Sequence, residues 1–289
     1  MITCNIQGGL GNQLFQLFTT ISFSIKVGEP FVFLKILDIK KQMNNRPPYW
    51  DNFLQSLQPF LRVSFKESFV LYKEPYFHYS DILTTLFQNN NNNMHSHNIA
   101  LNGYFQSFRY FHEAKNTILR LIQFEKQKKM VLQKYETIHF EQGVTSMHFR
   151  LGDYKNLQHK HPILPLEYYK NCLDFLCSFD NASKNVLVFC EEQDQQTIEP
   201  MIQTFKQEYP FLTFKMIDFN IPDWEQMILM SCCQDNIIAN STFSWWGAYL
   251  NDNSEKKVCY PEIWFGEQYK TCLDTRDLFL PEWNQIQIH

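Results

Sequence analysis

The sequence predicts an α/β fold with a parallel sheet, and two observations support this prediction. In the C-terminal half, short apolar runs alternate with amphipathic stretches of helical length. The runs cover residues 144–149, 185–190, 212–217, 236–239 and 257–260, and the helical stretches cover residues 166–179, 194–207, 224–233 and 244–250. This alternation is typical of a parallel sheet with helices on both faces. At the N-terminus, an apolar run over residues 2–6 leads through a glycine-rich loop into a helical pattern that ends before Gly28, and a further run follows at residues 31–34.

Length and composition narrow the class of protein. The 289 residues suffice for two domains, which we place at residues 1–140 and 141–289. The net charge of −4 gives no electrostatic reason to expect binding to nucleic acid or to an anionic membrane. Neither a basic leader nor an apolar run of membrane-spanning length occurs. The eight cysteines form no C-x-x-C pair, so we expect reduced, mostly buried thiols in a cytoplasmic protein.

The loop after the first apolar run contains Gly8, Gly9 and Gly11. The dinucleotide-binding pattern G-x-G-x-x-G is absent because Leu14 stands at its last position, and no Gly-Lys-Ser/Thr of a phosphate-binding loop occurs. Two interpretations remain. The glycines either let backbone N–H groups approach a ligand at a helix N-terminus, or they form a tight turn between strand and helix.

The run at residues 144–149 ends in a polar segment, His148-Phe149-Arg150-Leu151-Gly152-Asp153-Tyr154. Ligands of open α/β sheets bind outside the carboxyl ends of the strands, so we expect Arg150 to face a ligand. Its planar guanidinium suits a phosphate or a carboxylate. The alternative is an ordinary surface ion pair between Arg150 and Asp153.

A second polar segment, Asn240-Ser241-Thr242-Phe243-Ser244, follows the run at residues 236–239 and opens a helix. Hydroxyls and free N–H groups in the first turn of a helix can hold an anion, whereas the alternative is that a serine only caps the helix. Arg150, Glu191 and Asp218 follow other strands of the same sheet and are expected at the same edge. A phosphate site therefore explains the segment better than a cap alone.

Other stretches carry structural expectations. Trp245 and Trp246 are expected to pack in the interior, because the small residues Gly247 and Ala248 indicate a close helix contact. Residues 113–135 predict one amphipathic helix. The five asparagines at residues 89–93 predict a mobile surface loop.

A metal site is not expected. The chain has no Asp-x-Asp sequence. The pairs His95-x-His97 and His159-x-His161 each offer two ligands, which is too few.

Five motifs occur in one order along the chain: Gly8-Gly9-Leu10-Gly11-Asn12-Gln13, Gly103-Tyr104-Phe105-Gln106-Ser107, His148-x-Arg150-x-Gly152-Asp153-Tyr154, Pro165-Leu166-Glu167-Tyr168-Tyr169 and Ser241-Thr242-Phe243-Ser244-Trp245-Trp246-Gly247-Ala248. Together they resemble the α-1,2-fucosyltransferases of glycosyltransferase family 11, and the resemblance runs from residue 6 to about Trp283.

The resemblance implies a GT-B architecture, in which two Rossmann-like domains form an interdomain cleft, the first on the acceptor side and the second binding a GDP-sugar. It implies metal-independent, inverting transfer of L-fucose from GDP-β-L-fucose, with no further cofactor, to O2 of a terminal β-galactoside glycan. By their motif positions, Arg150 would hold the donor pyrophosphate, His148 would lie beside the guanine-ribose end, and Ser241-Thr242-Phe243-Ser244 would line the phosphate side. Gly9 and Gly11 belong to the loop that would reach the reacting sugar.

The chain departs from the family pattern at two places. Members often carry a second basic residue where this chain has Leu151. Many also have an acidic residue, which is thought to read guanine, near the start of the helix at residues 224–233. Glu225 and Gln226 are the donor-binding candidates at this position.

The mechanism that these parts imply needs charge stabilisation on the departing GDP, which Arg150 with hydroxyl and N–H donors can supply. The acceptor hydroxyl needs a partner for its proton. Asp153 is the first candidate, with the orientation of Arg150 as its alternative role, and Asn12 is a second candidate for orienting the nucleophile. A transferase that uses another GDP-6-deoxysugar and a catalytically inactive carbohydrate- or nucleotide-binding protein are the alternative functions.

Overall fold

The computed structural model describes residues 1–35, 49–89 and 98–288. The chain forms two compact units, the first made of Met1–Gln127 with Leu273–Leu280 and the second of Lys128–Cys272 with Pro281–His289. This division differs from an expected boundary at residue 140 because a C-terminal segment returns to the first unit. Residues 90–93 of the asparagine run, together with His95 and His97, lie outside the described residues.

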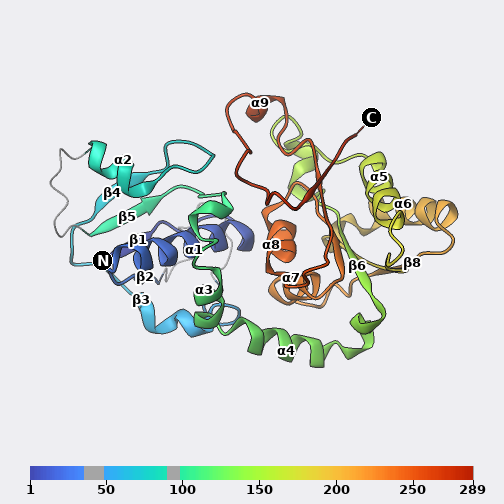
Figure 1. Cartoon of the computed structure of the whole chain (residues 1–289), viewed down its shortest axis with the longest axis horizontal. Coiled ribbons are helices and arrows are strands. Elements are labelled where there is room, and N and C mark those ends of the chain that lie inside the picture. Colours follow the sequence, from blue (N-terminus) through green and yellow to red (C-terminus); the bar gives the residue numbers. More distant parts are fainter. Residues whose placement is uncertain (36–48, 90–97, 289) are drawn as a thin grey trace. The chain divides into compact units, whose positions relative to one another are not determined.

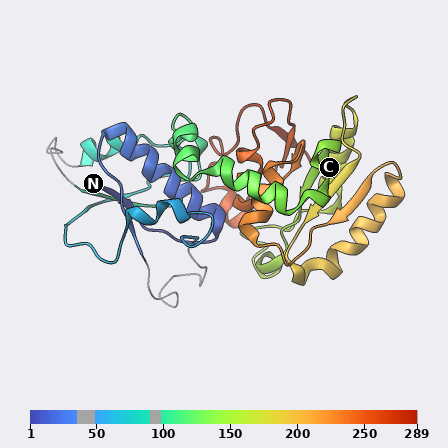
Figure 2. The same cartoon turned by 90° about the horizontal axis from the view of Figure 1, so that it is seen from below.

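The first unit contains parallel strands (Figure 1). One sheet has the order β1-β5-β4, formed by β1 (Ile2–Cys4), β5 (Ile99–Asn102) and β4 (Val70–Lys73). A second pair is formed by β2 (Phe33–Leu34) and β3 (Leu61–Arg62), and a bridge between Ile2 and Phe31 connects it to β1. Helix α1 (Leu10–Val27), blue in Figures 1 and 2, packs against β1 and ends at Gly28, whose φ of 71° suits glycine.

The amphipathic stretch at residues 113–135 was predicted as one helix, and this prediction is wrong. The structure has α3 (Lys115–Leu121) and α4 (Phe124–Lys134), separated at Gln123, which has a φ of 54°. A left-handed residue cannot continue a right-handed helix. The carbonyl of Ile122 at the break accepts a hydrogen bond of 2.7 Å from the Gln127 side chain, which compensates for the interrupted helical pattern.

The second unit has one parallel sheet of order β11-β10-β9-β6-β7-β8. Its strands are β6 (Val144–His148), β7 (Asn185–Phe189), β8 (Thr213–Met216), β9 (Asp235–Ile237), β10 (Val258–Pro261) and β11 (Asn284–Ile286). Its helices are α5 (Leu166–Cys177), α6 (Gln195–Glu208), α7 (Asp223–Ser231), α8 (Thr242–Leu250) and α9 (Glu267–Lys270). The predicted alternation of five strands and four helices is confirmed, and β11 is an additional strand.

Shorter elements complete the chain. The first unit also contains α2 (Ile82–Asn89). The 3-10 helices are η2 (Gln55–Phe60), η3 (Phe108–Tyr110), η4 (Glu136–Ile138), η5 (Phe140–Gln142), η6 (Gly152–Asn156) and η7 (Glu192–Asp194).

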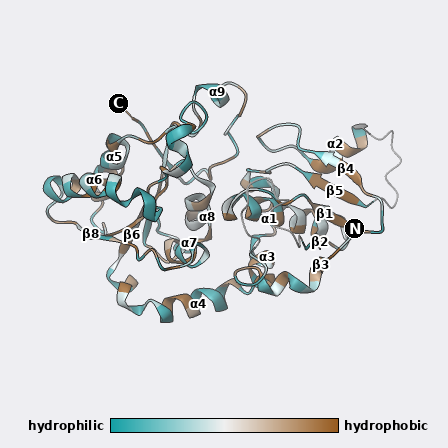
Figure 3. Ribbon diagram, turned by 180° about the vertical axis from the view of Figure 1, so that it is seen from behind, coloured by the Kyte–Doolittle hydropathy of each residue, from teal (hydrophilic) through white to brown (hydrophobic). Residues whose placement is uncertain are grey.

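The core of the second unit explains why its strands read as continuous apolar runs. Met147, Val186 and Val188 of the central strands are buried with Phe205 and Tyr169 of the covering helices. In the first unit, strands β4 and β5 also carry hydrophobic residues (Figure 3). A parallel sheet that is covered on both faces needs this pattern. The carboxyl ends of β6, β7 and β9 then form one edge, and the polar segments that follow them lie there.

Interior packing confirms the expectation for the tryptophans. Trp245 and Trp246 are fully buried. A Cβ at Gly247 would lie 2.7 Å from the Cβ of Met230, so α7 and α8 approach each other closely where residue 247 has no side chain. The cysteines are free, and Cys4, Cys172, Cys190, Cys233 and Cys259 are buried, as expected.

Candidate active site

Arg150 lies directly after β6, at the carboxyl edge of the second sheet. Its Nη2 donates to Asp153 Oδ1 at 2.6 Å and its Nη1 pairs with Glu191 Oε1 after β7. The guanidinium carbon lies 5.3 Å from the centre of the Tyr154 ring. The side chain is 18% exposed, so the guanidinium is fixed by its neighbours and still reaches the surface. The contact with Asp153 is the ion pair that the sequence offered as an alternative. The same contact is compatible with the suggested role of Asp153 in orienting Arg150.

The turn after Arg150 depends on a buried carboxylate. Asp194 is fully buried, and its two oxygens accept from the backbone N–H of Gly152 and the ammonium of Lys155, each at 2.7 Å. Gly152 has a φ of 30°, and a Cβ there would lie 2.7 Å from Glu191 Oε2. The glycine of the H-x-R-x-G-D-Y motif is therefore required both by the backbone conformation and by the approach of Glu191.

Tyr154 connects the two segments that the sequence singled out. Its hydroxyl donates to the carbonyl of Asn240 at 3.0 Å, and its ring stacks on His161 with centroids 4.9 Å apart. The Asn240 amide nitrogen donates to the carbonyls of Pro162 and Trp264 at 2.9 and 3.3 Å. Within the described part of the chain, the buried Oδ1 of Asn240 has no hydrogen-bond partner. Asn240 thus holds three segments together at the sheet edge.

Helix α8 begins at this edge. The Ser241 hydroxyl accepts from the N–H of Phe243 at 3.3 Å, so Ser241 is the N-cap, and the buried Ser244 hydroxyl donates back to the Ser241 carbonyl at 3.3 Å. Thr242 is half-buried beside them. The first turn of a helix carries a partial positive charge and N–H groups without helical partners. The cap therefore leaves a site that favours an anion.

His148 approaches the same helix. Its ring lies 5.6 Å from that of Phe243, and it is 6% exposed. Burial, with a smaller contribution from the Arg150 charge, lowers the pKa of His148 to about 3. The imidazole is therefore neutral near pH 7. Its Nδ1 has no hydrogen-bond partner among residues 1–35, 49–89 and 98–288. A buried polar atom of this kind is usually hydrogen-bonded to protein or to ordered water.

The remaining second-unit candidates lie in the first turn of α7. Both oxygens of the buried Glu225 accept from the ammonium of Lys134, at 3.0 and 2.8 Å, and the Tyr135 hydroxyl also donates to it. Gln226 donates to the carbonyl of Ile221 at 2.8 Å. These contacts join α7 to the end of α4, and a guanine-reading role for Glu225 stays a prediction. Asp218 Oδ1 accepts hydrogen bonds from the backbone N–H and the side-chain amide of Asn220.

The first-unit candidates lie between β1 and α1. Gln106, which follows β5, donates to Asn12 Oδ1 at 3.0 Å. Gly8 has a φ of 82°, and a Cβ there would lie 2.7 Å from the Asn12 amide nitrogen. Gly9 is the N-cap, with open space where a Cβ would stand, and Gly11 is buried in the helix. Of these three glycines, Gly8 has the backbone conformation that requires glycine.

Sequence reasoning missed several of these connecting residues as members of the site. Glu191 was expected at the sheet edge without a role, and Tyr154 and Asn240 were only parts of motifs. The signal for Glu191 was its position directly after a strand next to β6. Gln106 was part of a motif but had no assigned role, and its partner Asn12 lies 94 residues away in sequence. Asp194 offered no local signal, because its partner Gly152 lies 42 residues away.

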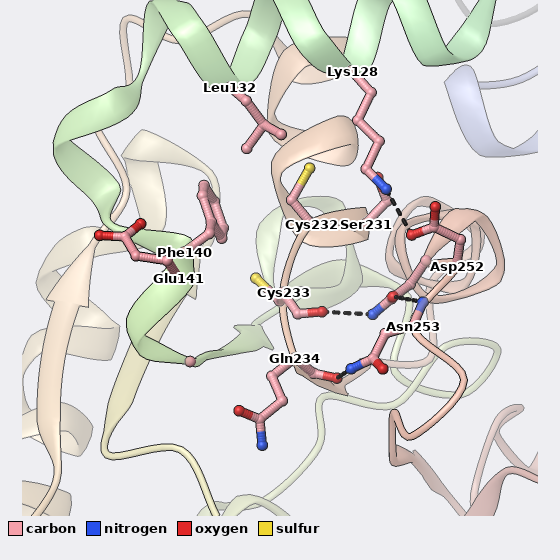
Figure 4. A pocket seen from close by; sticks show the side chains of 12 residues that line it. Lys128, Leu132, Phe140, Glu141, Ser231, Cys232, Cys233, Gln234, Asp252 and Asn253 are labelled. Carbon is pink, nitrogen blue, oxygen red and sulfur yellow. Dashed lines mark hydrogen bonds and ion pairs between the residues drawn. The ribbon is translucent and has the colours of Figure 1, made fainter.

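The opposite edge of the second sheet also has a hollow. A pocket of about 330 Å³ lies near the amino ends of β6 and β9. Lys128, Cys232 and Asp252 are among the residues that line it (Figure 4). It is therefore separate from the Arg150 edge. Among the residues that the structure describes, no group of three or more His, Cys, Asp or Glu is placed to hold a metal. No helix in the described ranges has the length and hydropathy to cross a membrane.

Comparison with solved structures supports the fold. The structure of E. coli ADP-heptose LPS heptosyltransferase II matches with a TM-score of 0.53 and 11% identity, over 100% of this chain and 90% of that one. The two α/β units with parallel sheets therefore have the GT-B type of fold. The family model "Glycosyl transferase family 11" matches residues 1–287, and the chain belongs to this family. The O-antigen biosynthesis glycosyltransferase WbnK of Escherichia coli is 27% identical, over 94% of this chain and 97% of WbnK.

Proposed function

We propose that the protein transfers L-fucose from GDP-β-L-fucose to O2 of a terminal β-galactoside, with inversion and without a metal ion. The observation that carries this proposal is Arg150, which is fixed at the carboxyl end of β6 beside the N-terminus of α8 in a family 11 chain. The guanidinium and the helix N-terminus together suit a diphosphate. The donor sugar and the acceptor come from the resemblance of the motifs.

The charges around Arg150 define how the donor would bind. In the described structure, one guanidinium faces the carboxylates of Asp153 and Glu191, so this group carries an excess negative charge. A diphosphate has to compete with these carboxylates for the guanidinium. Among the described residues, the hydroxyls and N–H groups at the start of α8 supply donors that neither carboxylate contacts, and these donors favour the phosphate.

In the proposed reaction, Arg150 and the α8 N-terminus stabilise the charge that develops on GDP as the bond to fucose C1 breaks. Neutral His148 offers an uncharged polar partner to the nucleoside end. Asp153 keeps Arg150 oriented and is also the proposed acceptor for the proton of the galactoside hydroxyl. Asn12 in the first unit is proposed to orient that hydroxyl.

A transfer assay tests the proposal. Purified protein is incubated with GDP-fucose, a second GDP-6-deoxysugar, GDP-mannose or UDP-galactose and a panel of β-galactosides, with and without EDTA, and the product linkage is determined by NMR. The expected result is an α-1,2-linked fucosyl product from GDP-fucose that EDTA leaves unchanged. Transfer from another GDP-6-deoxysugar would identify a different donor, and GDP binding without any transfer would identify an inactive binding protein.

Variants connect this assay to the site. Arg150→Ala should lower kcat by roughly a hundredfold or more, because the charge on the leaving GDP loses its main partner. The matched control is Arg120→Ala, since Arg120 is exposed on α3. An Arg150→Ala protein that is folded and has the wild-type rate would remove Arg150 from the mechanism.

A further inference from the structure

Glu74 stands at the carboxyl end of β4 and holds the loop that follows β5. Its Oε2 accepts from the backbone N–H groups of Tyr104 and Phe105 at 2.8 and 3.0 Å. Its Oε1 is buried and, within the described ranges, has no hydrogen-bond partner. None of the ion pairs found among the described residues involves Glu74. A carboxylate in this position costs desolvation energy, which its two N–H donors offset in part.

The loop is shaped around this carboxylate. A side chain at Gly103 would overlap the Cβ of Glu74, so the glycine permits the approach. Phe105 has a φ of 55°, a conformation that non-glycine residues adopt rarely and that the surroundings have to stabilise. Its buried ring stacks near Tyr72, with centroids 6.3 Å apart, and the Glu74 carboxylate satisfies its N–H.

Gln106, the next residue, connects this loop to Asn12 in the first turn of α1. Gln106 is 8% exposed, and its side-chain nitrogen donates to Asn12 Oδ1 at 3.0 Å. This bond fixes the orientation of the Asn12 amide and leaves its nitrogen as the group that can donate to a ligand. Glu74, the loop at residues 103–106 and Asn12 thus form one connected series from the end of β4, through the loop after β5, to the first turn of α1.

We propose that Glu74 is a positioning residue for the acceptor: it holds the loop at residues 103–106 so that Gln106 orients Asn12. This inference rests on the proposed function, in which Asn12 orients the acceptor hydroxyl. Glu74 acts through its acceptor oxygen and not as the base of the reaction, because Oε2 is occupied by two N–H groups and Oε1 is buried.

The charge of Glu74 is not what the loop requires. Burial raises the pKa of Glu74 to about 7, and the N–H groups of Phe105 and Tyr104 oppose this shift. A glutamine keeps an oxygen that can accept from both N–H groups and carries no charge. The amide variant should therefore preserve the loop, and the alanine variant should release it.

Steady-state kinetics provides the first test. Glu74→Ala should lower kcat by about tenfold, as expected when an orienting group is displaced, while the Kd for GDP stays at the wild-type value. Glu74→Gln should restore kcat to within about threefold of wild type, because the two hydrogen bonds are retained. If Glu74→Gln is as impaired as Glu74→Ala, the carboxylate itself is needed and the proposal is wrong.

A double-mutant comparison tests the path through Asn12. When Glu74 acts through Asn12, adding Glu74→Ala to Asn12→Ala causes no further loss of kcat. Losses that multiply would overturn the proposal. Gln106→Ala interrupts the series one step later and should lower kcat as Glu74→Ala does. It therefore tests the same path if Glu74→Ala folds poorly. Glu113→Gln is the control, since Glu113 is exposed.

Amide hydrogen exchange separates this inference from the proposed function, because it needs no substrate. Exchange at Tyr104 and Phe105 should be faster in Glu74→Ala than in wild type and unchanged in Glu74→Gln. If the wild type transfers no fucose but this exchange pattern is found, the proposed function fails and the Glu74 link stands. Unchanged exchange in Glu74→Ala would overturn the link whatever the enzyme does.

Discussion

The hydroxyl of Tyr154 donates to the backbone carbonyl of Asn240 across a sequence separation of 86 residues. This bond joins the turn after Arg150 to the segment that caps α8. The two parts proposed to bind the diphosphate are thereby held at one sheet edge, and the relation can be tested through donor binding.

Removing this bond should weaken GDP binding. Tyr154→Phe keeps the ring against Arg150 and leaves the Asn240 carbonyl without this donor, which should cost about 1–3 kcal/mol of stability and raise the Kd for GDP several-fold. Tyr209→Phe is the control, because the Tyr209 hydroxyl bonds to the Lys170 carbonyl and the Asp174 carboxylate, both on α5. Calorimetric titration with GDP gives both affinities. Equal GDP affinity in wild type and Tyr154→Phe would show that the bond does not shape the donor site.

Glu191 competes with the donor for Arg150. Glu191→Gln removes one negative charge beside the guanidinium and should strengthen GDP binding several-fold, with a difference that shrinks at high salt. The neighbouring Glu192 is exposed and serves as the control in Glu192→Gln. Weaker binding by Glu191→Gln, measured by the same titration, would mean that Glu191 orients Arg150 more than it opposes the phosphate.

His148 should make folding stability depend on pH in a defined direction. Its pKa is about 3 in the folded chain, below the ordinary value of 6.5. The unfolded chain therefore binds a proton at higher pH, and stability rises with pH between about 3 and 6.5, by at most about 1.4 kcal/mol per pH unit. The stabilising contribution is complete above pH 6.5 and is lost as the pH falls toward 3. Urea unfolding across this window should show a smaller slope for His148→Gln than for wild type. An unchanged slope for His148→Gln would contradict the burial of a neutral imidazole.

The α7–α8 contact should be intolerant of a methyl group. Gly247→Ala would place a Cβ 2.7 Å from Met230 Cβ and should lower the free energy of unfolding by about 1–3 kcal/mol through overpacking. Because Met230→Gly removes that Cβ, combining it with Gly247→Ala should cost less than the sum of the single losses. Additive losses in denaturant unfolding would show that the helices are not in the close contact described.

The parts of the fold that local pattern determines could be predicted from the sequence. Each of the five apolar runs predicted after residue 143 overlaps a strand of the sheet. The parallel sheet brings Arg150 and Glu191 to the same edge, where they contact. The packing of Trp245 and Trp246 followed from the small residues beside them. These features depend on residue type over a few positions.

Features set by distant partners could not be predicted. Strand β11 has the sequence Asn284-Gln285-Ile286, which shows no apolar run and forms a strand by pairing with β10. The break at Gln123 has no glycine or proline to announce it. The contact of Glu225 with Lys134, 91 residues away, was not predicted. Such contacts follow from tertiary packing, which a local pattern does not encode.

The central claim is that Arg150 holds the diphosphate of an activated sugar. A crystal structure of the protein soaked with GDP tests it most directly. We expect phosphate oxygens within hydrogen-bond distance of the Arg150 guanidinium and close to the first turn of α8, with the guanidinium drawn away from at least one of its carboxylates. GDP bound with its phosphates away from Arg150 would contradict the account.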